Sequence, residues 1–265
     1  FPRGGLLGKT RWRVQATHST DDGRVLDWLK RTSAVPDHAV LVSSLRADCL
    51  AIGPSGTAAS IEVVAEGADA GLRDHAHLLL MLAIALEDDG MRACKREAGV
   101  LAQLRGEFAA RDLLLREPID AQGDDKAKVP IVQMLGRAVT LGERKSLARG
   151  RQRAVLDRVL RDPSPDVIRL VLANPAVTEA DVIRLVARRP GVADVLREVF
   201  IALRFILRMD VRVSLVKNPR TPTDLSLAVL RTIPRGHVEE VATLADVPVS
   251  VRDLARRIIA RQPLH

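Results

Sequence analysis

Aromatic residues are scarce in this chain of 265 residues, which has no tyrosine, two tryptophans and four phenylalanines. Hydrophobic residues still make up 47% of the sequence, a fraction that excludes an intrinsically disordered protein. Because aromatic side chains contribute so little, the core must consist mainly of leucine, valine, isoleucine and alanine. This composition favours helices that pack against one another, and the length allows one large domain or two ordinary ones.

Cysteines and long apolar runs are also scarce. Two isolated cysteines, Cys49 and Cys94, predict reduced thiols in a cytosolic protein and exclude a disulfide framework. The longest apolar run, Leu78–Leu86, is too short to cross a bilayer and predicts a buried helix. We therefore expect a cytoplasmic protein with no membrane partner.

No catalytic or metal-binding motif is complete in this sequence. Gly4–Thr10 resembles the end of a phosphate-binding loop but lacks the first glycine and the preceding strand. His75 and His77 are two residues apart and would not face each other on a helix, so we expect one buried and one exposed histidine. The contiguous carboxylates of Leu86–Gly90 would not converge, and Cys49 has no identified base. We predict no catalytic residues, no metal and no cofactor, and favour a protein that is not an enzyme.

Negative charge is sparse in the second half of the chain. Residues 1–127 carry 16 Lys and Arg against 19 Asp and Glu, whereas residues 128–265 carry 25 against 14. This asymmetry predicts two modules, the second of which favours an acidic partner. A stretch with two prolines, clustered charges and no apolar period separates them. We expect an N-terminal module over 1–117, a linker over 118–130 and a second domain over 131–265.

The N-terminal module has mixed signals. Two segments rich in β-branched residues, His38–Leu45 and Ser60–Gly67, flank Gly53-Pro54, a pattern that predicts a hairpin or a small sheet. Residues 21–33 instead have the apolar spacing of a short amphipathic helix. The stronger apolar pattern over 72–117 predicts a buried helix followed by one or two more. We therefore expect a small module that is either α+β or helical.

Helix start signals recur throughout the second domain. Thr140–Glu143 has the sequence of a capping box, and Thr178–Asp181 repeats a threonine start with an acidic residue three positions later. Ser164 is expected as an N-cap with Pro165 at the first helical position, where a missing N–H costs nothing. The segments between these signals are mostly long enough for one helix each, so the domain should be helical.

Two Asn-Pro pairs mark a repeated joint. Asn174-Pro175 and Asn218-Pro219 are 44 residues apart, and the apolar positions before them match at the same offset. Each pair should end a helix, because the residue before a proline is driven out of helical geometry. The next helix should then start with a threonine, with Thr221 as the cap and Pro222 in the first position. A helix–turn–helix unit used more than once predicts a short right-handed α-solenoid.

These repeats resemble known families. Asp162–Pro190 is similar to HEAT-like and leucine-rich-variant repeats in its Asp-Pro entry, its Arg-centred apolar core, its Asn-Pro pair and its threonine cap. Val211–Leu230 carries the same features, and 141–259 as a whole resembles uncharacterised bacterial repeat proteins. The resemblance implies a binding scaffold rather than a catalytic activity. Some leucine-rich-variant proteins add a cysteine cluster for an iron–sulfur centre, and no such cluster is present in this sequence.

Basic residues near the repeat joints are the candidate binding residues. Equivalent positions line up on one face of a solenoid, where a row of cations can bind phosphates or an acidic protein surface. The same cations would also be favourable on solvated faces and in the last turns of helices. The predicted partner-binding residues are Arg169, Arg184, Arg188, Arg189, Arg212, Lys217 and Arg220. The leading hypothesis is a non-catalytic scaffold that binds an acidic protein partner.

Nucleic acid is the alternative partner. A basic HEAT-like solenoid can hold a duplex through phosphate contacts alone, and some bacterial HEAT-like DNA glycosylases resemble this plan. Those enzymes surround a damaged base with aromatic side chains, whereas the second half of this chain offers Phe200 and Phe205 without tryptophan or tyrosine. A nucleic-acid binder therefore ranks second, and a repair enzyme ranks below it.

Overall fold

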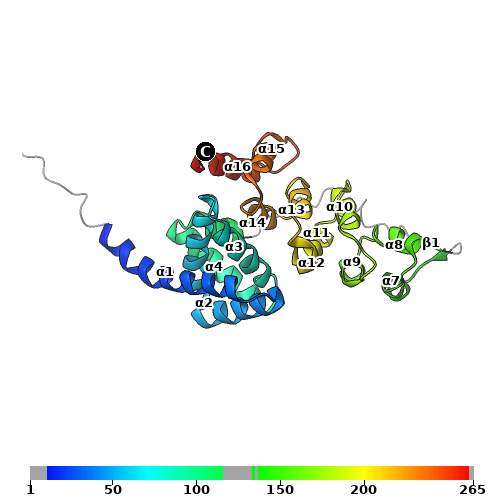
Figure 1. Cartoon of the computed structure of the whole chain (residues 1–265), viewed down its shortest axis with the longest axis horizontal. Coiled ribbons are helices and arrows are strands. Elements are labelled where there is room, and N and C mark those ends of the chain that lie inside the picture. The colour runs from blue at the N-terminus through cyan, green and yellow to red at the C-terminus, as the bar shows by residue number, and fades with distance from the viewer. Residues whose placement is uncertain (1–10, 116–132, 135–136, 263–265) are drawn as a thin grey trace, which may run out of the picture. The chain divides into compact units, whose positions relative to one another are not determined.

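The computed structural model shows a mainly α-helical protein (Figure 1). The residues that the structure describes are 11–115, 133–134 and 137–262. The chain divides into two compact units, Phe1–Leu115 and Arg116–His265. The predicted linker over 118–130 and the loop-like Gly4–Thr10 lie outside the described residues. Within the described ranges, no helix combines the length and the hydropathy that a membrane span requires.

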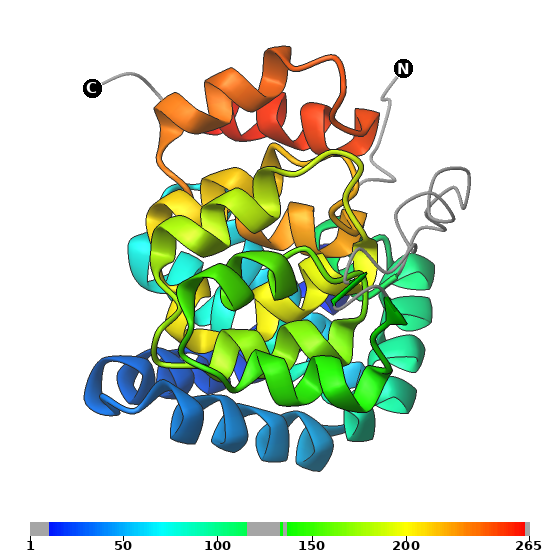
Figure 2. The same ribbon diagram turned by 90° about the vertical axis from the view of Figure 1, so that its right-hand side faces the viewer.

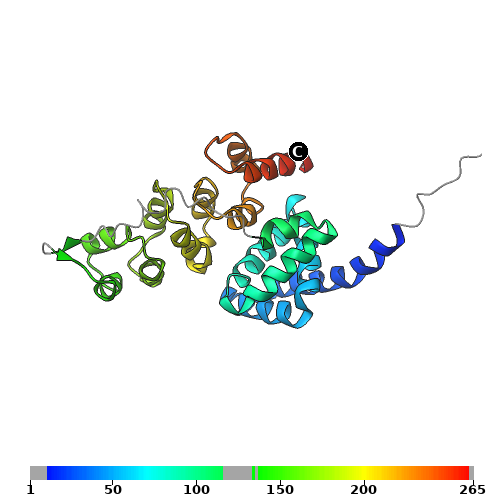
Figure 3. The same cartoon turned by 180° about the vertical axis from the view of Figure 1, so that it is seen from behind.

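The helices of the N-terminal unit pack around its longest helix, α2 (His38–Asp69), which contacts α1, α3, α4 and α5 (Figures 1 and 3). The other elements are α1 (Arg11–Ala34), α3 (Arg73–Ala85), the short 3-10 helix η1 (Asp89–Met91), α4 (Arg92–Arg105) and α5 (Phe108–Leu114). The helices predicted over 21–33 and 72–117 are confirmed by α1, α3, α4 and α5. The apolar run of the sequence supplies the buried face of α3, where Leu78 and Met81 are fully enclosed.

The predicted hairpin or small sheet is wrong, because both expected strands, His38–Leu45 and Ser60–Gly67, lie within α2. Their buried residues recur at helical spacing, as Leu41 and Leu45 do in the first segment. One face of a helix can therefore enter the core, and this burial outweighs the β preference of the individual valines. The predicted turn is a kink inside α2, where Gly53 has φ 73° and ψ 177° and is followed by a proline.

The C-terminal unit is a succession of short helices. They follow a two-residue antiparallel strand pair, β1 (Gln133–Met134) and β2 (Arg137–Ala138). The helices are α7 (Leu141–Ala148), α8 (Arg153–Val159), α9 (Pro165–Ala173), α10 (Glu179–Ala187), α11 (Ala193–Ile201), α12 (Leu203–Ile206), α13 (Met209–Val216), α14 (Thr223–Leu230), α15 (Arg235–Thr243) and α16 (Val249–Arg261).

These helices lie in two rows within their unit. In Figure 1, α8, α10 and α13 follow one another along one side, and α7, α9 and α12 lie along the other. Contacts run along the rows, from α7 to α9 to α11 and from α10 to α13, and also between them, as from α13 to α14. Figure 2 views the unit from the end that carries α7 and α8. Each helix thus buries its apolar stripe against its neighbours, because no single short helix could do so alone.

The two Asn-Pro joints bind the preceding helices through buried asparagines. Asn174 Nδ2 donates to the carbonyls of Ala148 (2.8 Å) and Gly150 (2.7 Å), at the end of α7. Asn218 Nδ2 makes the corresponding bond to the carbonyl of Val186, near the end of α10. Each side-chain oxygen accepts from the backbone N–H two residues on, at 2.9 Å. The prediction that these asparagines are structural is therefore confirmed, since each fixes a turn and satisfies a helix end.

The predicted helix starts agree with the structure at three places and fail at one. The capping boxes at Thr140 and Thr178 are both formed, and Ser164 is the N-cap of α9 with a proline at the first position. Thr221 is not the cap of α14: Pro222 occupies that position, and the helix starts at Thr223. The Thr221 hydroxyl is buried and donates to the Leu215 carbonyl (2.6 Å), so it serves the end of α13 instead.

Candidate functional site

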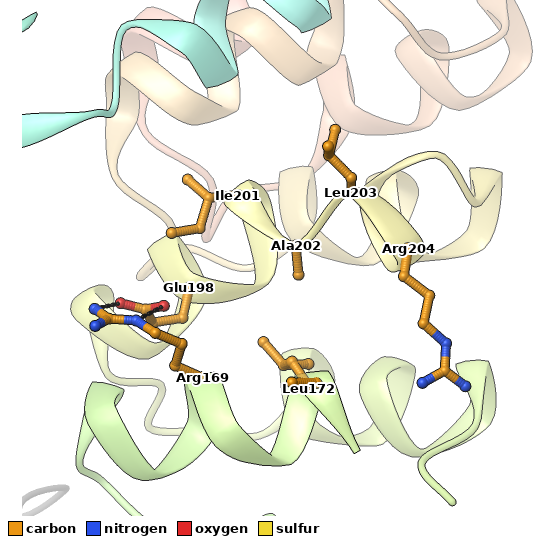
Figure 4. Close-up of a pocket in the computed structure, with 8 residues that line it drawn as sticks. Arg169, Leu172, Glu198, Ile201, Ala202, Leu203 and Arg204 are labelled. Atoms are coloured by element: carbon orange, nitrogen blue, oxygen red, sulfur yellow. Dashed lines mark hydrogen bonds and ion pairs between the residues drawn. The ribbon is translucent and has the colours of Figure 1, made fainter. Parts of the chain in front are cut away.

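Arg169, the first predicted binding residue, lies at one end of an apolar pocket of about 280 Å³ between α9 and the α11–α12 segment. Figure 4 shows its guanidinium facing Glu198, with Leu172 on the pocket floor and Arg204 at the other end. Arg169 donates to Glu198 from Nε (3.0 Å) and from Nη2 (2.6 Å). Arg204 donates to three backbone carbonyls of the loop 174–177. The pocket is an apolar slot whose flanking cations are both engaged within the protein.

Four further predicted residues make contacts within the C-terminal unit. Arg212 is half-buried and donates to a backbone carbonyl at Thr232 (2.9 Å), and burial lowers its pKa. Arg189 Nη2 donates to the backbone carbonyl of Lys217 (3.0 Å). Lys217 itself pairs with Glu240, and this pairing lowers the pKa of the glutamate. Arg220 is half-buried, and its backbone N–H is the one that donates to the second joint asparagine. These four cations do not form an open binding row.

The remaining two, Arg184 and Arg188, meet in one pocket together with Arg161, which the sequence reading missed. This pocket, called the arginine pocket below, has a volume of about 390 Å³. Its lining residues are Asp157, Leu160, Arg161, Asp181, Arg184, Leu185 and Arg188. They come from α8, from α10 and from the residues that directly follow each of these helices. The pocket therefore spans two successive helices of the same row.

Arg184 belongs to a network with balanced charge at one side of the arginine pocket. Asp181 is buried and accepts from Arg153 and Arg184, and it also accepts from the backbone and hydroxyl of Thr178 at 2.9 Å. The hydrogen bond from Arg153 is the main reason why the pKa of Asp181 lies far below its usual value. Arg153 also pairs with Asp157 (2.6 Å). Two arginines thus neutralise two aspartates, and all four side chains hold α8 against α10.

The positive charges of Arg161 and Arg188 are not neutralised by this network. Within the described residues, neither side chain has a hydrogen bond or an ion pair. Arg188 is half-buried, and its pKa is lowered by desolvation and then by the nearby charge of Arg161. The carboxylates of Asp157 and Asp181 line the same pocket but are paired with Arg153 and Arg184, so the two like charges repel each other and the pocket is suited to an anion.

Sequence position offers a signal for Arg161. It lies two residues before Pro163, just as Arg188 lies two before Pro190 and Lys217 two before Pro219. These prolines follow α8, α10 and α13, so the three cations occupy corresponding positions at the ends of successive helices. Lys217 differs from the other two because it is paired with a glutamate of α15.

The other residues considered for catalysis or metal binding do not form a site within the described residues. The three consecutive carboxylates at 87–89 bind different cations: Glu87 pairs with Lys95, Asp88 with Arg46 and Asp89 with Arg92. Cys49 is fully buried, and desolvation is the main reason that its pKa is raised to about 12, so its thiolate is not available. Within the described residues, no three His, Cys, Asp or Glu side chains are placed to hold a metal ion.

The two histidines of α3 also differ from the prediction, since both are half-buried rather than one buried and one exposed. The ring of His75 lies where a Cβ on Gly67 would be, and burial lowers its pKa. The ring of His77 contacts that of His38 edge-on, with centroids 5.3 Å apart. Both rings contact residues of α2 and contribute to the packing of α3 against it.

Comparisons with protein-family models, with curated proteins and with solved structures gave no match to this chain.

Proposed function

We propose that the C-terminal unit is a HEAT-like, right-handed α-solenoid and a non-catalytic scaffold. The support is the pair of helix rows, with α8, α10 and α13 along one side and α7, α9 and α12 along the other, and the recurrence of one joint design. At both joints the side-chain amide of a buried asparagine donates to a backbone carbonyl at or near the end of a helix that lies earlier in the chain. Repeats that contact mainly their neighbours present long surfaces suited to binding another chain.

We further propose that the arginine pocket is where the scaffold binds an acidic segment of a protein partner. The observation that carries this proposal is the pair of guanidiniums, Arg161 and Arg188, that line one recess without a carboxylate partner among the described residues. An incoming carboxylate or other anion gains charge-assisted hydrogen bonds there and relieves the repulsion between the two cations. Leu160 and Leu185 give the recess an apolar wall that strengthens these contacts by excluding water.

Nucleic acid remains the second candidate because of the basic charge of this unit. A duplex presents phosphates in a long row and is held by many independent cations. Most of the predicted row is already engaged in intramolecular contacts: Arg169 with Glu198, Arg189 and Arg212 with backbone carbonyls, and Lys217 with Glu240. One recess with two spare cations fits a local anionic group on a protein better than a continuous backbone.

The test compares binding by the full chain and by charge-removed variants. Immobilised wild type, Arg161→Gln/Arg188→Gln and the control Arg158→Gln would each be exposed to poly-glutamate peptide and to duplex DNA at about 100 mM salt. Arg158 is exposed on α8, outside the pocket lining, so its loss removes the same kind of charge nearby. We expect the peptide to bind wild type and control, and the double variant to bind at least about tenfold more weakly. Equal retention on all three proteins would contradict the proposed site, and salt-sensitive retention of DNA alone would favour the nucleic-acid alternative.

A further inference from the structure

The net charge of the arginine pocket indicates which anionic group it accepts. Arg153 and Arg184 balance Asp157 and Asp181, so two full positive charges, those of Arg161 and Arg188, remain without compensation. A single carboxylate brings one negative charge and would leave either the exposed Arg161 or the half-buried Arg188 without a counter-ion. A phosphoryl group on a side chain carries about −1.5 to −2 at neutral pH and therefore matches the surplus.

The geometry of the donors points in the same direction. The two arginines line the recess from the ends of different helices, since Arg161 follows α8 and Arg188 follows α10. A flat carboxylate is satisfied by one guanidinium fork, whereas a phosphoryl group has three terminal oxygens and can accept from two forks at once. Both aspartates of the lining are already paired with arginines of the network and so repel an incoming anion less.

We infer that the arginine pocket binds the phosphoryl group of a phosphorylated serine, threonine or tyrosine on the protein partner. This inference rests on the proposed function and deepens it, because it names the group that the scaffold recognises. A nucleic-acid phosphodiester is a poorer match, since each carries one charge and the pocket is a single recess of about 390 Å³. Binding would bridge α8 and α10 through the anion and replace the repulsion between the two cations by two attractive contacts.

The experiment uses pools of peptides because the sequence around the phosphoryl group is not specified by the pocket. Three pools share the same degenerate flanking positions and differ at the centre, which is phosphoserine, serine or Asp-Asp. Retention of each pool would be measured on the immobilised full chain, as wild type, Arg161→Gln, Arg188→Gln and the control Arg158→Gln. We expect stronger retention of the phosphoserine pool than of the Asp-Asp and serine pools on wild type and control, and a loss of about tenfold or more with either pocket variant.

The pH dependence of retention gives a second readout. The second pKa of a phosphoryl group is about 6, so binding of its dianion should strengthen between about pH 5 and pH 7. Arginine stays charged over this range, and the carboxylates of the Asp-Asp pool are ionised throughout, so neither of them can produce that rise. A pH-independent affinity of the phosphoserine pool would count against recognition of the dianion.

The outcomes separate this inference from the proposed function. Equal retention of the phosphoserine and serine pools overturns the inference. Retention of the Asp-Asp pool that depends on Arg161 and Arg188, with no advantage for phosphoserine, overturns the inference but leaves the acidic-segment scaffold standing. If no pool is retained, both fail, and binding of duplex DNA by the same variants then decides for the nucleic-acid alternative.

Discussion

Replacing Asn218 by alanine should destabilise the C-terminal unit strongly, although the residue lies in a loop between helices. Asn218 is 1% exposed, and its side chain donates to the Val186 carbonyl and accepts from the Arg220 N–H (2.9 Å). Val186 is fully buried, so its carbonyl would lose its partner in a dry environment at a cost of about 1–3 kcal/mol. The Arg220 N–H is half-buried and can recover some hydration, which adds about 1 kcal/mol. The expected loss in unfolding free energy is therefore about 2–4 kcal/mol.

Urea denaturation followed by far-ultraviolet circular dichroism would measure this loss, and amide hydrogen exchange in α10 and α13 would assign it to the joint. The adjacent Lys217→Ala is the control, because it removes a partly exposed ion pair with Glu240 and should cost about 0–1 kcal/mol. A loss for Asn218→Ala no larger than that for Lys217→Ala would show that the Asn218 side chain does not stabilise the joint. The same outcome would remove the physical basis for regarding the Asn-Pro pairs as repeat joints.

Three further predictions concern caps, pH and thiol reactivity. Thr178→Ala should cost about 0.5–2 kcal/mol in urea denaturation because it removes a formed capping box, whereas Ser164→Ala should cost little because that side chain makes no cap bond. The hydrogen bond from Arg153 holds the pKa of Asp181 down, so wild type should lose stability as the pH falls below about 4, and Asp181→Asn should flatten that part of the stability–pH curve. With its pKa raised to about 12 by burial, Cys49 should resist iodoacetamide at about pH 8 until the protein unfolds, as mass spectrometry can show.

Helix boundaries in the C-terminal unit could be predicted from the sequence because short-range chemistry determines them. Threonine caps, first-turn prolines and Asn-Pro pairs act within a few residues, and Thr140, Thr178 and Ser164 all lie where these rules place them. Thr221 was misassigned by one position, because Pro222 is the N-cap of α14 and the helix starts at Thr223. The Thr221 hydroxyl instead donates to the Leu215 carbonyl at the end of α13, a bond that the capping rules do not include.

The error in the N-terminal unit has a different cause. Valine-rich segments on either side of Gly53-Pro54 match a hairpin locally, and composition alone cannot distinguish that hairpin from a kinked helix. The decisive factor is the helical spacing of Leu41, Leu45 and Cys49, all fully buried, because it lets one face of α2 enter the core. In this segment the helical spacing of the buried residues indicates the secondary structure better than β propensity does.

The candidate site could be predicted only in part from the sequence, because the positions of the arginines do not reveal which of them form ion pairs with carboxylates. The partner of Arg169 is Glu198, on a later helix, and Lys217 reaches Glu240 in the same way. These carboxylates become neighbours only when helices stack. Arg188 was among the predicted binding residues and lines the arginine pocket, whereas Arg161 was not predicted and joins it where the ends of α8 and α10 lie close together.

The central claim is that Arg188 is kept for binding and not for stability. The most direct measurement is the unfolding free energy of wild type and Arg188→Gln at equal ionic strength, in chloride and in inorganic phosphate. In chloride the variant should be at least as stable as wild type, because the repulsion from Arg161 is relieved. Phosphate at about ten times its Kd should stabilise wild type by about 1.4 kcal/mol and the variant by much less. A variant that is less stable in chloride by more than about 1 kcal/mol, or that responds to phosphate as wild type does, would contradict the account.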